Sequence, residues 1–179
     1  MLIGPGGAGK GTVAEQLVAK DPTLWLSRSW TTRGPRPGET SDSYVFVDAD
    51  AFRAHAAAGG FLEWAEFLGH LYGTPNPTPP PGADVLLEID IQGARQVAAA
   101  RPEAVVVLLL PPSPEVQAVR LEGRGDSAEQ VAQRIEKGID EVRSGMEIAR
   151  HVVVNDDVER ATGEVAGIVD RARSSRRPV

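Results

Sequence analysis

The chain has 179 residues, no cysteine and a formal net charge of −6, and it is 41% hydrophobic and 25% charged. This composition is typical of one soluble globular domain and excludes disulfides and thiolate metal sites. The negative charge disfavours nucleic acid as a partner, and the apolar runs are too short to span a membrane, so a cytoplasmic location is expected.

A glycine-rich loop at residues 4–10 follows a first strand of at most three residues, which is either a stub or the end of a strand that starts upstream. The loop has the spacing G-x-x-x-x-G-K and precedes a helical pattern with Val13 and Leu17 on one face. Backbone N–H groups of such a loop surround a phosphate, and Lys10 would reach the β- and γ-phosphates of ATP. The alternative is a glycine-rich turn with a solvated lysine. The predicted ATP-binding residues of this segment are Gly4, Gly6, Gly7, Ala8, Gly9, Lys10, Gly11 and Thr12.

The residue after the lysine departs from the motif. Ser or Thr is expected there to help hold Mg²⁺, whereas this chain has Gly11 followed by Thr12. We therefore expect Mg²⁺ to arrive with ATP and to be held largely through water, with Thr12 as a weak protein ligand. At this one spot the sequence resembles adenylate kinases.

Strands and helices alternate through most of the remaining chain. Apolar runs bounded by turn residues predict buried strands at 24–26, 85–89, 105–110 and 152–154. Periodic patterns predict helices at 114–121 with Ser113 as the N-cap, at 128–143, and after Asp157. This alternation favours an α/β fold with a parallel sheet flanked by helices on both faces.

Residues 34–82 interrupt the alternation and predict an inserted small α+β subdomain. The segment closes with a proline-rich run at 75–82 that cannot be helix or central strand. Within it we expect short strands at 44–47, 61–64 and 70–72 and an alanine-rich helix at 50–58. Residues 1–33 and 83–179 would then form the core.

Residues 29–39, Ser-Trp-Thr-Thr-Arg-Gly-Pro-Arg-Pro-Gly-Glu, closely resemble the guanylate kinase signature S-x-T-T-R-x-P-R-x-G-E. Further matches follow in the family's order at 44–46, 61–65, 72–74, 88–93, 120–125 and 154–157. The chain therefore resembles the guanylate kinase family over nearly its full length. The resemblance implies a P-loop NTPase-type core, an inserted GMP-binding subdomain, a lid at about 122–136, and phosphorylation of GMP or dGMP by ATP.

The resemblance also implies a GMP site suited to both ends of that nucleotide. Arg33 and Arg36 offer planar forks for phosphate oxygens. Guanine presents an N1–H and an amine, both donors, so a carboxylate that faces them selects guanine, and Glu63 matches that role. The alternatives are solvated arginines, an edge-strand carboxylate and tyrosines that only pack, and Asp90 also resembles a Walker-B acid near Mg²⁺. The predicted GMP-binding residues are Ser29, Arg33, Arg36, Tyr44, Glu63, Tyr72, Thr74 and Asp90.

Arg124 and Arg134 lie on either side of a break between two helical patterns. The resemblance implies that they swing over the transferred phosphoryl group and stabilise charge on its oxygens. Arg120 is a weaker candidate that could equally lie on the surface. No general base is needed, because the acceptor is already a phosphate oxyanion. The predicted catalytic residues are Lys10, Arg36, Arg124 and Arg134.

Asn155 follows the last predicted strand and heads a pair of aspartates that would cap the final helix. In the family this asparagine lies near the adenine of ATP, so the resemblance adds Asn155 to the ATP site. The family's short helix ahead of the next core strand is replaced here by the proline-rich run. We expect that change to affect GMP affinity and closure more than the chemistry.

Two other functions compete with a kinase that acts on GMP. A noncatalytic guanylate-kinase-like module would bind phosphorylated peptides in the GMP cleft, but such a module has no use for Lys10 and a complete phosphate loop. An adenylate kinase is suggested by Gly11 and Thr12 and is disfavoured by Glu63 and by residues 29–39. Whether the protein is a monomer or a homodimer stays open.

Overall fold

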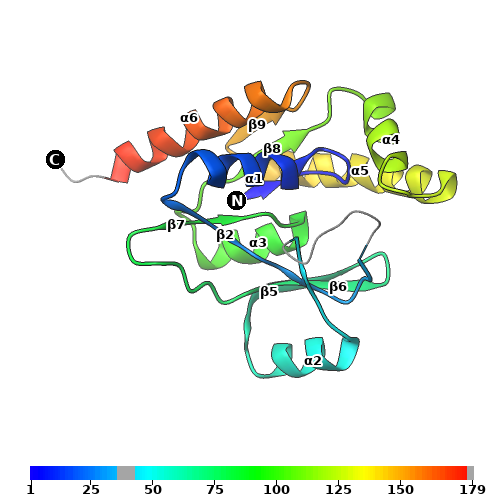
Figure 1. The fold of residues 1–179 in the computed structure, drawn as a ribbon, viewed down its shortest axis with the longest axis horizontal. Coiled ribbons are helices and arrows are strands. Elements are labelled where there is room, and N and C mark those ends of the chain that lie inside the picture. The colour runs from blue at the N-terminus through cyan, green and yellow to red at the C-terminus, as the bar shows by residue number, and fades with distance from the viewer. Residues whose placement is uncertain (36–42, 177–179) are drawn as a thin grey trace.

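The computed structural model describes residues 1–35 and 43–176, so the predicted site residue Arg36 lies outside the described residues. Figure 1 shows the helices and strands in chain order, coloured from blue to red. One group comprises β1 Leu2–Ile3, α1 Lys10–Lys20, β2 Leu24–Ser27, β7 Asp84–Leu87, α3 Ile91–Ala100, β8 Val107–Leu110, α4 Pro114–Glu122, α5 Ala128–Ile148, β9 His151–Val154 and α6 Val158–Arg176. The other comprises β3 Trp30–Thr31, β4 Val45–Phe46, α2 Ala49–Ala57, β5 Phe61–Phe67 and β6 His70–Pro75.

Parallel strands form the main sheet. β1, β8 and β9 pair in parallel, and so do β2 and β7. A parallel bridge between Leu2 and Glu88 joins these two pieces, and Ile89 N donates to Leu2 O at 3.3 Å. The resulting order is β2-β7-β1-β8-β9, which confirms the predicted α/β fold with a parallel sheet.

Apolar side chains cover both faces of the main sheet. Val107 and Leu109 of β8 pack in a cluster with α1 and α6, two helices that lie together in Figure 1. Leu108, between them in sequence, packs in a second cluster with α3. Burial on both faces explains why these strands read as continuous apolar runs rather than as alternating ones. Within the described residues, no helix has a stretch long and apolar enough to cross a membrane.

The helix α3 is absent from the elements that the sequence predicts. Asp90 caps it, because its Oδ1 accepts a hydrogen bond from Gly93 N at 2.8 Å. The buried side of α3 carries few large apolar residues, and Gly93 near its start weakens the helical pattern. The helix is therefore stabilised by its cap and by packing on the sheet, neither of which the periodicity displays.

The helix α5 extends to Ile148, beyond the predicted end at residue 143. Gly145 reads as a helix terminator in the sequence, yet it lies within α5 and is buried. A Cβ at this position would lie 2.9 Å from Leu108 Cδ1 and 3.3 Å from Ile91 Cδ1. The glycine therefore allows α5 to pack closely on β8 and does not mark the end of the helix.

A smaller mixed sheet, in the order β4-β3-β6-β5, carries α2 on the side away from the main sheet (Figure 1). It begins at Trp30, upstream of residue 34, because β3 pairs with both β4 and β6. Pro75 is the last residue of β6 and pairs with Phe61, so one proline of the 75–82 run does belong to a strand. The rest of that run forms neither helix nor strand.

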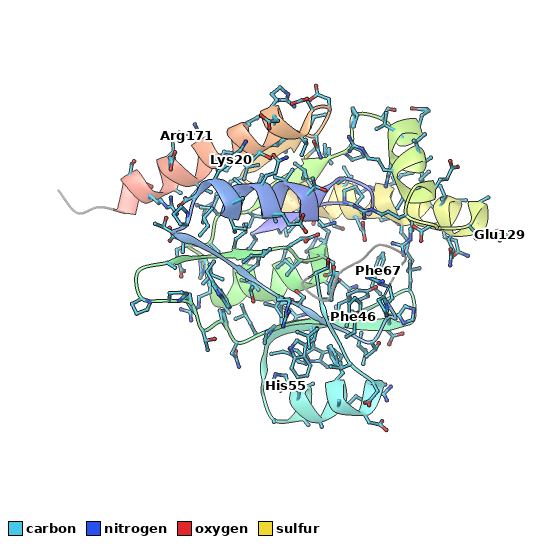
Figure 2. The ribbon with its side chains drawn as sticks, viewed as in Figure 1. Lys20, Phe46, His55, Phe67, Glu129 and Arg171 are labelled. Carbon is cyan, nitrogen blue, oxygen red and sulfur yellow. The ribbon has the colours of Figure 1, made fainter. Side chains whose placement is uncertain are left out.

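Aromatic side chains hold α2 against the smaller sheet. Phe52 is fully buried and stacks on Phe61, with ring centroids 4.5 Å apart. His55, labelled in Figure 2, stacks on Trp30 at 4.4 Å and meets Phe61 edge-on. These contacts give the small sheet an apolar core of its own.

Arg173 of α6 forms hydrogen bonds with residues just before β2 and at the start of β7. Its Nε donates to Asp84 Oδ2 at 2.7 Å, and its Nη1 donates to Asp21 Oδ2 at 2.6 Å. A third donor, Nη2, reaches Thr23 Oγ1 at 2.9 Å. We expect Arg173→Ala to lower the free energy of unfolding by about 1 to 2 kcal/mol, because a half-buried network exceeds the usual worth of a single surface pair.

Urea unfolding of Arg173→Ala and Arg171→Ala checks this expectation. Arg171 lies on the exposed side of the same helix, as Figure 2 shows. Its replacement removes the same charge without the network and should change stability by less than about 0.5 kcal/mol. Equal unfolding midpoints for the two variants would contradict a stabilising role for the Arg173 network.

Candidate active site

The glycine loop leads directly into α1, with Gly9 as the N-cap in a left-handed conformation at φ 89°. Gly7 also has a positive φ, 83°, which side-chain-bearing residues rarely adopt. No described side chain caps α1 at Gly9. Within the loop Ala8 N donates to Pro5 O at 3.2 Å. Backbone N–H groups of the first helical turn have no side-chain cap and can bind an anion, and the helix dipole favours a negative charge there.

Lys10 is the first residue of α1 and folds back over the loop. Its Nζ donates to Gly4 O at 2.7 Å and to Pro5 O at 3.3 Å. The ammonium group is thus held beside the loop by two carbonyl groups, which a phosphate can replace as partners. This position agrees with the predicted role of Lys10 in contacting phosphate.

Side chains behind the loop hold its carbonyl groups. Gln117 Nε2 donates to Gly6 O at 2.7 Å, and Asn155 Nδ2 donates to Ala8 O at 2.8 Å. Arg120 Nη2 donates to Asn155 O at 2.8 Å, and its Nη1 reaches the Ala8 carbonyl at 3.5 Å. Arg120 is therefore neither a free surface residue nor directed at the cleft, and the buried Asn155 lies behind the loop.

A cleft of about 820 Å³, including space open to solvent, lies between the loop, the small sheet and α5. Among the predicted site residues, those that line the cleft are Gly4, Gly6, Lys10, Ser29, Arg33, Tyr44, Glu63, Tyr72, Asp90, Arg124 and Arg134. The predicted residues outside its lining are Gly7, Ala8, Gly9, Gly11, Thr12, Thr74 and Asn155. Gly73, Glu88 and Ile89 also line it; they lie in the matched segments 72–74 and 88–93, but the sequence assigns them no site role. Phe67 and Glu141 line it as well, and the sequence does not single them out.

Glu63 is a buried carboxylate in the wall of this cleft, and strand pairing places it opposite Thr74. Thr74 Oγ1 donates to Glu63 Oε1 at 2.5 Å, and Thr74 N donates to the same oxygen at 3.1 Å. Burial raises the pKa of Glu63 to about 7, and repulsion from Asp90 adds to the rise while the Thr74 donors oppose it. Thr74 thus acts on the cleft through Glu63.

Glycine at position 93 allows the Glu63 carboxylate to approach the N-terminus of α3. A Cβ on Gly93 would overlap that carboxylate. Asp90, the N-cap of α3, lines the cleft next to Glu63. Two acidic side chains therefore converge on one end of the cleft, where they would attract hydrogen-bond donors.

Arg33 and the tyrosines form another wall of the cleft. The Arg33 guanidinium lies 5.6 Å from the Tyr44 ring centroid, and its Nη1 donates to Gly34 O at 2.7 Å. Tyr44 and Tyr72 meet edge to face at 6.1 Å. A guanidinium fixed against aromatic rings presents its remaining N–H groups in a defined direction, as bidentate recognition of phosphate requires.

The break between α4 and α5 brings two arginines to the cleft. Arg134 Nε lies 3.2 Å from Asp126 Oδ2, and both side chains are largely buried. A Cβ on Gly6 would lie 3.5 Å from Arg134 Nη1, so this arginine lies next to the phosphate loop. Arg124 lines the cleft from the break itself. Both cations are therefore close to where the loop would hold phosphate.

Glu141 of α5 is a half-buried acid that lines the same cleft. Burial raises its pKa, while the charges of Lys10, Lys137 and Arg134 favour the ionised form and that of Asp90 opposes it. In the sequence Glu141 is one of many charged residues along α5, so no local signal distinguishes it. Only the tertiary packing brings it to the lysine.

Glu88 is the acid next to Gly11, the residue that replaces the usual hydroxyl. A Cβ at position 11 would lie 3.4 Å from Glu88 Oε2. Carboxylate oxygens are preferred ligands of Mg²⁺ and of its bound waters, so the donor set fits that ion. Thr12 is exposed. Within the described residues no cluster of three or more His, Asp or Glu side chains would hold a metal alone.

The family model described as guanylate kinase matches residues 1–172. The chain belongs to the guanylate kinase family. Among curated members, the guanylate kinase of Synechococcus sp. (strain CC9311) is 44% identical over 170 residues, which cover 92% of this chain and 90% of the relative. A guanylate kinase of Thermus thermophilus is 45% identical over 184 residues, covering 98% of this chain and 83% of the relative.

Solved guanylate kinase structures share this architecture. The crystal structure of guanylate kinase from Anaplasma phagocytophilum matches with a TM-score of 0.74 and 29% sequence identity. The match covers 95% of this chain and 82% of that chain. The family resemblance of residues 29–39 and of the later motifs is therefore confirmed.

Proposed function

We propose that the chain transfers the γ-phosphoryl group of ATP to GMP, and also to dGMP, in one cleft that receives both nucleotides. The observation that carries this proposal is that the buried Glu63 and the phosphate-loop Lys10 line the same cleft. One end thus offers an acceptor for guanine and the other offers cations and N–H groups for phosphate. Membership in the guanylate kinase family supports this arrangement.

The donor half of the site is the loop with its lysine. ATP phosphates would bind inward N–H groups of residues 6–12, and Lys10 would exchange Gly4 O and Pro5 O for phosphate oxygens. The lysine charge stabilises the β–γ region as the bond to the γ-phosphorus breaks. Asn155 and Arg120 would act on ATP indirectly, since both hold the back of the loop.

The acceptor half combines a carboxylate with an arginine. The ionised Glu63 would accept hydrogen bonds from guanine N1–H and the exocyclic amine, which adenine cannot supply together. Arg33, Tyr44 and Tyr72 would hold the GMP phosphate. Arg36, assigned to the same phosphate by the family signature, lies outside the described residues and remains part of the proposal.

Arg124 and Arg134 would complete the site from the lid. In a loose transition state the negative charge lies on the equatorial oxygens of the transferred group, which two guanidinium groups can neutralise. Arg134 is held by Asp126 beside the loop, so a shift of the 123–127 break would carry both arginines toward phosphate. No side chain needs to remove a proton from the GMP phosphate.

Mg²⁺ is the cofactor that ATP brings to such a site. Glu88, beside Gly11, and Thr12 would hold the ion, largely through its waters. The ion neutralises charge on the β- and γ-phosphates when it is bound. Asp90 caps α3 and lies with Glu63, which supports its assignment to the guanine end of the cleft.

Turnover of ATP·Mg²⁺ with GMP, dGMP, AMP, CMP and UMP in parallel tests the proposal. We expect rapid ADP formation with GMP, slower formation with dGMP, and background with the other acceptors. Turnover with AMP but not with GMP would overturn the assignment. Absence of turnover with every acceptor would favour a noncatalytic module that binds phosphorylated peptides.

A further inference from the structure

We infer that Gln117 is a positioning residue that fixes the orientation of the Gly6–Gly7 peptide in the phosphate loop and thereby strengthens ATP binding. The inference rests on the proposed function in taking ATP as the ligand of the loop. Gln117 lies on α4, is only 5% exposed, and takes no part in the chemistry described above. Its Nε2 donates to Gly6 O at 2.7 Å.

Because the peptide group is planar, the hydrogen bond that fixes the Gly6 carbonyl also fixes the direction of the Gly7 N–H group. In a trans peptide the carbonyl of one residue and the N–H of the next point in opposite directions. Gln117 holds Gly6 O on the α4 side of the loop, so the N–H of Gly7 is directed to the opposite side. Because Gly4, Gly6 and Lys10, on either side of Gly7 in the loop, line the cleft, we infer that the Gly7 N–H is directed toward it.

The peptide that Gln117 holds has little restraint of its own. Glycines lie on both sides of it, and Gly7 has a φ of 83°. Glycine pairs reorient more easily than other residues, because no Cβ limits φ and ψ. A side-chain donor that fixes one carbonyl therefore reduces the entropy that the loop loses when phosphate binds.

Tight packing leaves the Gln117 amide few alternative positions. A Cβ on Gly7 would lie 3.1 Å from Gln117 Cγ. From the other side, a Cβ on Gly138 of α5 would lie 3.2 Å from Gln117 Nε2 and 3.2 Å from Pro5 Cβ. The amide is thus enclosed between the loop and α5, and the only other buried residue of α4 is the apolar Leu121.

Gln117→Leu removes the donor with little change in volume and tests the inference. We expect the dissociation constant for ADP·Mg²⁺ to rise roughly fivefold to tenfold, the equivalent of one buried hydrogen bond. The dissociation constant for GMP should not change. Titration calorimetry with each nucleotide separately measures both values and does not depend on turnover.

Gln96→Leu is the matched control. Gln96 Nε2 of α3 also donates to a backbone carbonyl, at 2.9 Å. Its acceptor is the carbonyl of Trp64 in β5, on the small sheet and not in the loop. This variant loses the same kind of contact away from the loop, so its ADP affinity should equal that of the parent protein. A loss of ADP affinity as large as that of Gln117→Leu would show that the effect is not specific to the loop.

Gln117→Glu adds a readout that a purely structural role would not produce. An ionised carboxylate cannot donate to Gly6 O, whereas a protonated one can. ADP affinity, divided by that of the parent protein at each pH, should therefore recover as the pH falls. The same ratio for Gln117→Leu should not depend on pH.

Gly138→Ala disturbs the same amide from α5 and keeps the test decisive if the Gln117 variants do not fold. Alanine favours the helix, yet its methyl group must displace Gln117 or Pro5, so ADP affinity should fall several-fold while stability holds or rises. Gly163→Ala on α6, where a Cβ meets no atom within 4 Å, should leave ADP affinity unchanged.

Parent-like ADP binding by folded Gln117→Leu, or equal losses for ADP and GMP, would overturn the inference. Parent-like ADP binding by Gly138→Ala would do the same if the Gln117 variants do not fold. The proposed function has a separate readout, because it fails when GMP turnover is absent. ADP binding by the loop is measured without an acceptor and can succeed or fail on its own.

Discussion

Lys10→Ala lowers kcat by about 100-fold or more, because it removes a cation that stabilises charge in the transition state for phosphoryl transfer. Among the described residues, the hydrogen-bond partners of the Lys10 ammonium are the Gly4 and Pro5 carbonyls, and neither is a competing acid. The Lys10 ammonium group is therefore available to phosphate oxygens. The KM for ATP should rise less than kcat falls, since loop N–H groups still hold the phosphates.

Steady-state kinetics with saturating GMP measures this effect, and Lys20→Ala is the matched control. Lys20 lies at the other end of the same helix, on the surface, as Figure 2 shows. Its removal changes the net charge by the same amount and should leave kcat within about twofold of the parent. A near-normal kcat for Lys10→Ala would end its assignment to catalysis.

Glu63→Gln lowers kcat/KM for GMP by about 100-fold and reduces the preference for GMP over AMP. The replacement keeps the shape and the acceptor that Thr74 contacts, but it presents an N–H group to the donors of guanine. The ratio of GMP to AMP turnover measures the change. An unchanged ratio would remove Glu63 from the guanine pocket.

The same variant should be more stable than the parent protein above neutral pH. The native pKa of Glu63 is raised to about 7 from an ordinary 4.5, so the folded protein holds this proton more tightly than the unfolded chain. Stability therefore falls as the pH rises from about 4.5 to 7. Glutamine does not ionise, and Glu63→Gln should gain up to about 3 kcal/mol at pH 8 and little at pH 4.5.

Unfolding by urea at the two pH values checks this gain. A gain that is equal at both pH values would assign the effect to packing and not to the charge. GMP binding should depend on pH in the opposite direction to stability: as the pH rises, the stability of the parent protein falls but its affinity for GMP increases. In the parent the dissociation constant for GMP should rise as the pH falls below 7, because guanine binds the ionised carboxylate, and this part of the pH dependence should disappear in Glu63→Gln.

The sequence predicted the main sheet well because its strands are continuous apolar runs. Residues 105–110, for example, contain β8, which is buried on both faces. The helix α3 was missed because its stability comes from the Asp90 cap and from contacts with the sheet. The helix α5 continues past the predicted end at residue 143, because Gly145 packs against Leu108 within the helix and does not end it.

The residues of the candidate site also fall into two groups, those that the sequence predicts and those that it does not. Lys10, Arg33 and Glu63 belong to contiguous motifs, and the cleft brings them together as the family resemblance implies. Gln117 and Glu141 have no local signature, since a glutamine or glutamate on a charged helix reads as solvated. The hydrogen bond of Gln117 to the loop and the electrostatic interaction of Glu141 with Lys10 depend on how α4 and α5 pack, which periodicity does not specify.

Asn155 and Arg120 form a third case. The resemblance places Asn155 near adenine, and Arg120 reads equally well as a surface residue. In the structure both side chains donate to carbonyl groups at the back of the phosphate loop. Sequence motifs identify such residues without revealing whether they act on the ligand or on the backbone that binds it.

The close approach of α5 to β8 at Gly145 bears on how the proposed lid would move. A Cβ at position 145 would lie only 2.9 Å from Leu108 Cδ1, so the backbone of α5 lies directly against β8 at this point. Arg134 lies eleven residues before Gly145 on the same helix, about 16 Å along its axis. We therefore expect a tilt of α5 about this point of close approach to displace Arg134 more than the residues beside Gly145.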